Sequence, residues 1–424
     1  MNNRLSKSGS ILARALGLII LAAICHTATA VESSARADTA TSPDVECLLN
    51  WAQTFYPSLF SPSSPDLQFS SPYIYRYYPT TNAYLGVSSA NDHVYYLRPN
   101  DVSPQDIGDL SAWLKEAGCG TIPYPVIFIH GIASSADTWA PFRDYLINNA
   151  GWLFGGIPGY NPSTRNVAIN CPPSPSQPVS CTGGAGDFYT LNFSDSQNLS
   201  FDVQGGELAA IIQAVLQANP GKAKVLLVGH SMGALAAREY LQGLAREANA
   251  STTIPYRDDV AKLITVGAPH RGSFWAEGCY SHFDVLNVSG NIGICSLLSL
   301  NIDPNSIALR DLQPDSSPLN ILNDFAAHPL PAAVSYVSII GTGQSTLSGL
   351  ISFDSGDGIV LDSSQDLATL TGNLSLQLKS VKVNVLFREC GNEVNIPLAP
   401  NIAETHTCET SDPGVGVEIL KDLQ

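Results

Sequence analysis

Charged side chains are scarce in this 424-residue chain. They make up 14% of it, and only 21 Lys and Arg stand against 37 Asp and Glu. The resulting net charge of −16 leaves no basic surface able to hold a polyanion, which argues against nucleic-acid binding and adhesion to anionic lipid. Disorder is disfavoured too, because 44% of the residues are hydrophobic. These figures predict a folded, acidic protein of two or three domains.

Long hydrophobic runs are also missing. The apolar run from Ala15 to Cys25 is well short of the roughly 20 residues that cross a bilayer as a helix, and no later segment is long enough. Basic residues precede this run and the small residues Ala28-Thr29-Ala30 follow it, a pattern typical of a secretory signal peptide cleaved near Ala30. We therefore expect an exported protein, extracellular or periplasmic, with no stable transmembrane anchor.

Metal-binding cysteine patterns are absent, since the nine cysteines form neither Cys-x-x-Cys pairs nor Cys/His clusters. Cys25 lies in the signal peptide, and the even number that remains in an exported protein predicts a disulfide framework. Pairing between sequence neighbours is the simplest of about 105 arrangements. It gives the pairs Cys47–Cys119, Cys171–Cys181, Cys279–Cys295 and Cys390–Cys408. No metal and no cofactor are expected.

Changes in composition divide the exported part of the chain into three segments. Residues 31–44 are typical of a flexible linker, residues 45–121 of a small Tyr-rich α+β module, and residues 122–424 of a larger domain. In the module, helical patterns at 47–55 and 107–114 flank three strand-like alternations. Its eight tyrosines could form an aromatic surface that grips a substrate, but packing within a three-stranded meander is the favoured interpretation.

From residue 122 onward, apolar runs alternate with amphipathic segments. Such runs are typical of strands buried on both faces of a parallel sheet, and they occur at 125–129, 224–228, 263–266, 334–340 and 381–387. Amphipathic patterns predict helices at 137–148, 202–218 and 234–248. This alternation predicts an α/β fold with a mostly parallel central sheet and helices on both of its faces.

A candidate nucleophile stands where one predicted strand turns into a helix, in Val228-Gly229-His230-Ser231-Met232-Gly233-Ala234. A nucleophile on so sharp a turn needs small residues two positions before and after it, since larger side chains would collide with the strand and the helix. Gly229 and Gly233 meet this need. The five-residue pattern alone is weak, but its position between strand and helix predicts Ser231 as a nucleophile rather than a serine in an ordinary turn.

Serine needs a base to take its proton, and on such a fold the chain order is serine, acid, histidine. His406 is the histidine that follows the candidate acids, in a polar segment that we expect to be a loop. His328 is the alternative base, but it would require another chain order. The acid should follow the strand at 334–340, where three carboxylates lie close together in the sequence: Asp354, Asp357 and Asp362.

Asp357 is the preferred acid because it stands between two glycines and before an apolar pair. Asp354 is the second choice, and the three carboxylates could equally belong to a solvated loop or a weak calcium site. An acyl-transfer site also needs two backbone N–H groups for the oxyanion. Met232, next to the nucleophile, would supply one, and Ile132, after Gly131 in an early strand–loop segment, would supply the other.

Four ordered motifs carry a resemblance to a known family: Ile129–Ile132, Gly229–Gly233, Gly267–Ser273 and Ser355–Val360. Together they resemble secreted bacterial lipases of the α/β-hydrolase fold and the related GPI-inositol-deacylase-like hydrolases, over about residues 122–424. The resemblance implies a triad of Ser231, Asp357 and His406, with Ile132 and Met232 forming the oxyanion hole. Two features depart from the common pattern: Ala234, where many relatives have a third glycine, and the cysteine-clipped insertions.

An apolar insertion at 273–332 is expected to be either a cap over the nucleophile or a set of extra core helices. The features together predict a secreted serine hydrolase that cleaves neutral carboxylic esters through an acyl-enzyme, as a triacylglycerol lipase or carboxylesterase. A secreted polyester depolymerase is the second choice. The alternative from a different class is a non-catalytic hydrolase-fold protein used for binding or adhesion.

Overall fold

The computed structural model describes residues 47–49, 67–70, 73–78, 83–88, 93–98, 103–110, 113–114, 122–172, 180–280, 302–349, 352–372, 376–385, 395–396, 399–400 and 402–423. The predicted signal peptide and linker lie outside this set. The chain divides into two compact units, one before Ile122 with Asn149–Gly151, the other made of Ile122–Asn148 and Trp152–Leu423. None of the helices formed by the described residues has the length and apolarity of a membrane span.

The first unit contains a five-stranded antiparallel meander. Its strands are β1 (Leu67–Ser70), β2 (Tyr73–Tyr78), β3 (Ala83–Ser88), β4 (His93–Leu97) and β5 (Gln105–Asp109). The three predicted strands are confirmed as β2, β3 and β4. The helix expected at 107–114 is wrong in its first part, because β5 pairs with the open edge of β4 and satisfies that strand's backbone groups. Among the tyrosines of this unit, Tyr96 is buried, as the packing interpretation expects.

An eight-stranded sheet forms the centre of the second unit, in the order β15–β12–β11–β10–β6–β9–β7–β8. Its strands are β6 (Val126–Ile129), β7 (Phe154–Asn161), β8 (Asn166–Asn170), β9 (Phe188–Thr190), β10 (Val225–His230), β11 (Val260–Val266), β12 (Ser335–Thr342) and β15 (Gln377–Asn384). Neighbouring strands are parallel except for the edge pair β7–β8. The prediction of a mostly parallel sheet is therefore confirmed.

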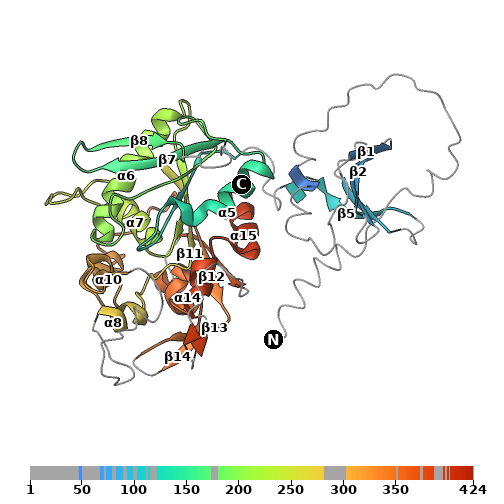
Figure 1. Cartoon of the computed structure of the whole chain (residues 1–424). Helices are drawn as coiled ribbons and strands as arrows, with labels where there is room; N and C mark the ends of the chain where they lie inside the picture. The colour runs from blue at the N-terminus through green and yellow to red at the C-terminus, as the bar shows by residue number, and fades with distance from the viewer. Residues whose placement is uncertain are drawn as a thin grey trace, which may run out of the picture. The chain divides into compact units, whose positions relative to one another are not determined.

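Helices cover both faces of this sheet. They include α5 (Ala140–Asn148), which continues the 3₁₀ turn η1 (Ala136–Trp139), α6 (Phe201–Ala218), α7 (Met232–Leu241) and α15 (Pro413–Leu423). Figure 1 shows α6 and α7 on one side of the strands and α5 and α15 on the other. The predicted apolar face of α6 is fully buried at Leu208, Ile211, Ile212 and Val215. Each such side chain contributes about 1.5–3 kcal/mol through burial.

Two predicted elements differ from the structure, one because of local backbone geometry and the other because of tertiary packing. The helix expected at 234–248 ends at Leu241, because Gly243 adopts a φ of 69° and turns the chain out of the helix. His406 lies in a helix, α14 (Ile402–Cys408), and not in a loop. Thr405, His406 and Cys408 are all buried, so tertiary packing outweighs the weak helix propensity of this polar segment.

Short elements connect the sheet to the functional residues. The hairpin of β13 (Gln344–Leu347) and β14 (Phe353–Gly356) follows β12 and leads directly to Asp357. After it come α12 (Asp362–Gln365) and α13 (Leu367–Thr371), and a small pair, β16 (Asn395–Ile396) and β17 (Ala399–Pro400), precedes α14. The chain thus returns twice to the carboxyl ends of the parallel strands, where Ser231 follows β10.

One predicted disulfide is confirmed, the Cys171–Cys181 bond, which closes the segment between β8 and β9. Cys47, Cys279 and Cys408 are disulfide-bonded as well. Their predicted partners, Cys119, Cys295 and Cys390, lie outside the described residues.

The described part of the insertion at 273–332 packs into the core. It forms α8 (Phe274–Tyr280), α10 (Ile307–Asp311) and α11 (Ser317–Leu322). Trp275, Leu309 and Leu322 from these helices belong to the same buried cluster as α6 and α7. This part therefore completes the core, while residues 281–301, with most of the remaining apolar side chains, lie outside the described residues.

Candidate active site

Ser231 occupies a strained turn between β10 and α7. Its φ and ψ angles are 53° and −130°, a conformation that residues other than glycine rarely adopt. The turn is also crowded, since a Cβ at Gly229 would lie 2.7 Å from the Cα of Ala234. A Cβ at Gly233 would lie 2.4 Å from the backbone oxygen of His130. Both glycines are therefore sterically required, for the reason that the sequence motif suggests.

His406 lies between Ser231 and Asp357 and contacts both. The Nδ1–H of His406 donates to Oδ2 of Asp357 over 2.8 Å, and the Oγ–H of Ser231 donates to Nε2 of the same ring over 3.0 Å. Because an ionised carboxylate can only accept, the proton on the neutral ring is on Nδ1 and the lone pair on Nε2 faces the serine. The structure thus joins three predicted residues that are far apart in the chain.

Asp357 is fully buried and receives hydrogen bonds on both carboxylate oxygens. Oδ1 accepts from the backbone N–H groups of Ile359 at 2.8 Å and Val360 at 2.7 Å. Oδ2 accepts from the Gln365 side-chain amide at 3.1 Å in addition to His406. These donors replace the water that burial removes, so the negative charge is stabilised on this side chain.

The two other candidate acids point elsewhere. Asp354 is exposed, and its Oδ1 accepts from the N–H of its own neighbour Ser355 at 2.8 Å. Asp362 accepts from the Lys382 ammonium group at 2.7 Å and from the Thr342 hydroxyl at 2.9 Å. Among the described residues, these three carboxylates do not form a group whose oxygens lie close enough together to share a cation, as the calcium alternative would require.

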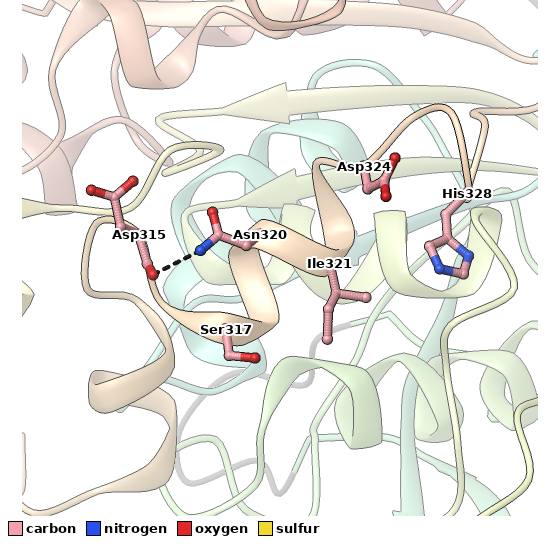
Figure 2. A pocket seen from close by; sticks show the side chains of 6 residues that line it. All are labelled: Asp315, Ser317, Asn320, Ile321, Asp324 and His328. Atoms are coloured by element: carbon pink, nitrogen blue, oxygen red, sulfur yellow. Dashed lines mark hydrogen bonds between the residues drawn. The ribbon is translucent and has the colours of Figure 1, made fainter.

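The alternative base, His328, lines a separate surface hollow of about 370 Å³ (Figure 2). Its other lining residues belong to α11 and the turns beside it: Asp315, Ser317, Asn320, Ile321 and Asp324. The residues that line this hollow do not include Ser231, His406 or Asp357, which are hydrogen-bonded to one another in that order. The structure therefore does not bring His328 to the nucleophile.

The loop after β6 lies directly against the nucleophile. A Cβ at Gly131 would be 2.8 Å from the Cβ of Ser231, so a side chain cannot be placed there without displacement. The Nδ1–H of His130 donates to the Gly131 carbonyl over 2.9 Å, and the N–H of Phe193 donates to His130 Nε2 over 3.3 Å. Burial lowers the pKa of His130 to about 4, which keeps the ring neutral in this arrangement.

This hydrogen bond sets the direction of the next amide. In a planar trans peptide the N–H points opposite to the C=O of the same unit, so fixing the Gly131 carbonyl also fixes the N–H of Ile132. Met232 begins α7, where the first amides of a helix have no acceptor within it. Both predicted donors are therefore backbone groups with restricted directions next to Ser231.

Two further buried groups surround His406 that the sequence analysis did not predict. The Nε2–H of His230 donates to the backbone oxygen of His406 over 3.0 Å, and the two rings lie 4.8 Å apart. Burial, followed by the neighbouring His406, lowers the pKa of His230 well below its usual value. Glu409, fully buried, places Oε2 3.6 Å from His406 Nδ1 and 3.4 Å from His230 Nε2. Its spacing of three residues after His406 is the sequence signal that could have revealed it.

His230, His406 and Glu409 have ligand atoms within 4.8 Å of one another, a spacing that alone would suit a metal ion. The ring nitrogens facing the group already have partners. Nδ1 of His406 donates to Asp357, and Nε2 of His230 donates to a backbone carbonyl. The two ring nitrogens that face Glu409 are therefore both engaged in hydrogen bonds with other partners.

Comparisons with known proteins identify one matching family and several similar solved structures. Residues 126–343, just over half of the chain, match the Alpha/beta hydrolase family. A solved structure of the lin2722 gene product of Listeria innocua is similar at 16% identity over 70% of this chain and 92% of that one, with a TM-score of 0.42. Bacillus licheniformis lipase BlEst2 in its mature form is similar at 17% identity over 62% and 86%, with a TM-score of 0.37.

Clostridium botulinum EstA is similar at 13% identity over 62% of this chain and 82% of that one, with a TM-score of 0.35. The family match spans β6, the nucleophile turn and β12, the elements that carry the sheet and Ser231. The chain therefore belongs to the alpha/beta hydrolase family.

Proposed function

We propose that this protein is a secreted serine hydrolase that cleaves neutral carboxylic esters, as a lipase or carboxylesterase. The observation that carries the proposal is the continuous path from Ser231 Oγ through His406 to Asp357, with contacts of 3.0 and 2.8 Å. Nucleophile, base and acid have the mutual geometry of a Ser–His–Asp triad. The family match supports hydrolase chemistry, since the nucleophile lies within the matched residues.

In the proposed reaction, Ser231 Oγ attacks the ester carbonyl while its proton moves to His406 Nε2. Asp357 then faces an imidazolium ring whose Nδ1–H it already accepts, so the positive charge is stabilised without rearrangement. Collapse of the tetrahedral intermediate releases the alcohol, which takes the proton from Nε2. Water, deprotonated by the same nitrogen, attacks the acyl-enzyme. Collapse of the second tetrahedral intermediate breaks the bond to Ser231 Oγ, which takes the proton from Nε2, and the carboxylic acid leaves.

The oxyanion of both tetrahedral intermediates would be bound by the N–H groups of Ile132 and Met232. The support for this assignment is the contact of Gly131 with Ser231 and the hydrogen bond that fixes the Gly131 carbonyl. Removing one such donor typically costs on the order of 10²- to 10³-fold in kcat.

Two independent features support the neutral charge of the proposed substrate and the proposed export of the protein. The net charge of −16 disfavours anionic substrates at long range, so we assign a neutral ester. The Cys171–Cys181 bond favours an oxidising compartment, in agreement with the signal-peptide pattern.

Wild-type protein is expected to hydrolyse p-nitrophenyl esters, and an active-site fluorophosphonate is expected to block the activity by bonding to Ser231. The test measures release of p-nitrophenol over acyl chains from acetate to palmitate. Mass spectrometry of the inhibited protein then locates the modified peptide. Absence of turnover with every chain length, or modification of a serine elsewhere, would contradict the proposal.

Asp357→Asn is expected to lower kcat by at least about tenfold and by as much as about 10⁴-fold, because asparagine cannot enforce the Nδ1–H tautomer of His406. Asp354→Asn is the matched control, since this carboxylate is exposed and accepts a hydrogen bond from the N–H of the adjacent Ser355. Its kcat should stay within about twofold of wild type. A larger loss at position 354 than at 357 would overturn the choice of acid.

A further inference from the structure

Glu409 is a buried carboxyl group without a hydrogen-bond donor among the described residues. Its side chain is 0% exposed, and neither Oε1 nor Oε2 accepts a hydrogen bond from an N–H or O–H group of that set. The two ring nitrogens closest to it, on His406 and His230, direct their protons to Asp357 and to a backbone carbonyl. An ionised carboxylate in such surroundings would be costly, because burial removes the water that stabilises its charge and no donor replaces that water.

The space around this carboxyl group is created by two glycines at the ends of neighbouring strands. A Cβ at Gly267, which follows β11, would lie 1.9 Å from Oε2, and a Cβ at Gly341, within β12, would lie 1.9 Å from Oε1. Any larger residue at either position would therefore displace the carboxyl group. The pocket fits Glu409 on two sides, which argues for a defined position and not for an accidental burial.

A proton on Glu409 follows from the position of its carboxyl group, which approaches the same ring nitrogen of His406 as Asp357 does. Oδ2 of Asp357 lies 2.8 Å, and Oε2 of Glu409 3.6 Å, from the same atom, Nδ1 of His406. Two ionised carboxylates so close together would repel one another, so one of the two carries a proton. Asp357 accepts from two backbone amides, Gln365 and His406, whereas Glu409 has no donor in the described structure. The charge is thus better stabilised on Asp357 and the proton on Glu409.

The titratable groups around Glu409 support this assignment. Burial raises the pKa of Glu409 well above its usual value, and the charges of Asp357 and then Asp412 raise it further. His230, from β10, is held neutral by its own burial and adds no positive charge. Strands β11 and β12 contribute glycine at their contacts with the carboxyl group.

We propose that Glu409 is a positioning residue that stays protonated at neutral pH and donates its proton in a hydrogen bond to Asp357, thereby holding the carboxylate that orients His406. This inference rests on the proposed function for its effect on turnover. A neutral Glu409 leaves one negative charge beside His406, which balances the imidazolium formed in the transition state. A second negative charge would stabilise the protonated ring in the resting enzyme, where it cannot accept the proton of Ser231.

The first test measures stability and does not depend on activity. In the unfolded chain a glutamate ionises near pH 4.3, whereas the folded protein keeps this proton to higher pH. Unfolding then releases a proton, so the contribution of Glu409 to stability falls as the pH rises above that value. Glutamine has no proton to lose. The Tm of Glu409→Gln relative to wild type is therefore expected to rise by at least about 3 °C between pH 5 and pH 8.

The matched control is Glu418→Gln on α15, where the carboxylate faces Lys421 at 3.2 Å. Its Tm relative to wild type should not rise with pH. A flat or falling difference for Glu409→Gln would show that Glu409 is ionised in the folded protein and would overturn the inference, whether or not the protein hydrolyses esters.

The second test compares kinetics of two variants at pH 7.5. Glu409→Gln keeps a donor toward Asp357 and should retain kcat within about threefold of wild type. Glu409→Leu has a similar volume but no donor, and its kcat should fall by at least about tenfold with KM within about twofold. Equal loss in both variants would show that the carboxyl group itself is needed, and equal retention would show no positioning role; either result overturns the inference.

Discussion

Ser231→Ala is expected to lower kcat for p-nitrophenyl ester hydrolysis by on the order of 10⁵- to 10⁶-fold, with KM changed by less than about threefold. The loss is this large because the variant has no atom that can form the acyl-enzyme, so only polarisation of the carbonyl by the oxyanion donors remains. Alanine lacks one oxygen and is small enough for the same turn. The Tm should therefore remain close to that of wild type.

The control for this variant is Ser335→Ala at the start of β12, which removes a hydroxyl that bonds to Gln377 at the start of the neighbouring strand β15. Both residues lie at the amino ends of the parallel strands, whereas Ser231 follows the carboxyl end of β10. Its kcat should stay within about twofold of wild type. Residual activity of Ser231→Ala above about 1% would mean that another group attacks the ester. Fluorophosphonate labelling that persists in the variant would lead to the same conclusion.

His406→Ala is expected to lower kcat by about the same factor, and the double variant with Ser231→Ala should be no less active than either single variant. Serine and histidine act as one unit here, since the 3.0 Å contact makes the nucleophile depend on the base. Once either is absent, the other has no further role in turnover. The measurement is kcat for the two single variants and the double variant under identical conditions.

His328→Ala is the matched control, because His328 lines the separate hollow beside α11 and was the alternative base. It should retain kcat within about twofold. A comparable loss at position 328 would reject the assignment of His406. Losses that multiply in the double variant would show that the two residues act independently, which the hydrogen-bonded geometry does not allow.

Much of the sheet and of the nucleophile turn could be predicted because their causes are local. Strands such as β6 and β10 are buried along their whole length, and burial on both faces requires the continuous apolar runs that the sequence displays. Gly229 and Gly233 are required because a Cβ at either position would lie only 2.4 to 2.7 Å from a backbone atom. The backbone atoms concerned belong to Ala234, a few residues away, and to His130, at the end of the adjoining strand. Features that depend on short-range geometry can therefore be predicted from the sequence.

Other parts of the fold depend on contacts between residues that are far apart in the chain, and these cannot be predicted from a short segment. Strands β7 and β9 escaped prediction because β7 contains glycines and a proline, and its pairing is decided by the neighbouring strands. The helix around His406 forms because three of its residues are buried against the sheet. Glu409 is the clearest case, since its pocket is made by Gly267 and Gly341, from two other strands.

The backbone of Ser231 has a consequence for the stability of the fold. At φ 53° and ψ −130° a glycine has less backbone strain than a serine. Stability of the fold alone would therefore favour glycine at this position. Retaining a side chain at this position costs stability, about 1–3 kcal/mol for a residue in such a conformation. In the proposed function, nucleophilic attack by the Ser231 hydroxyl is the benefit that offsets this cost. The same backbone that positions the nucleophile therefore also lowers the stability of the fold.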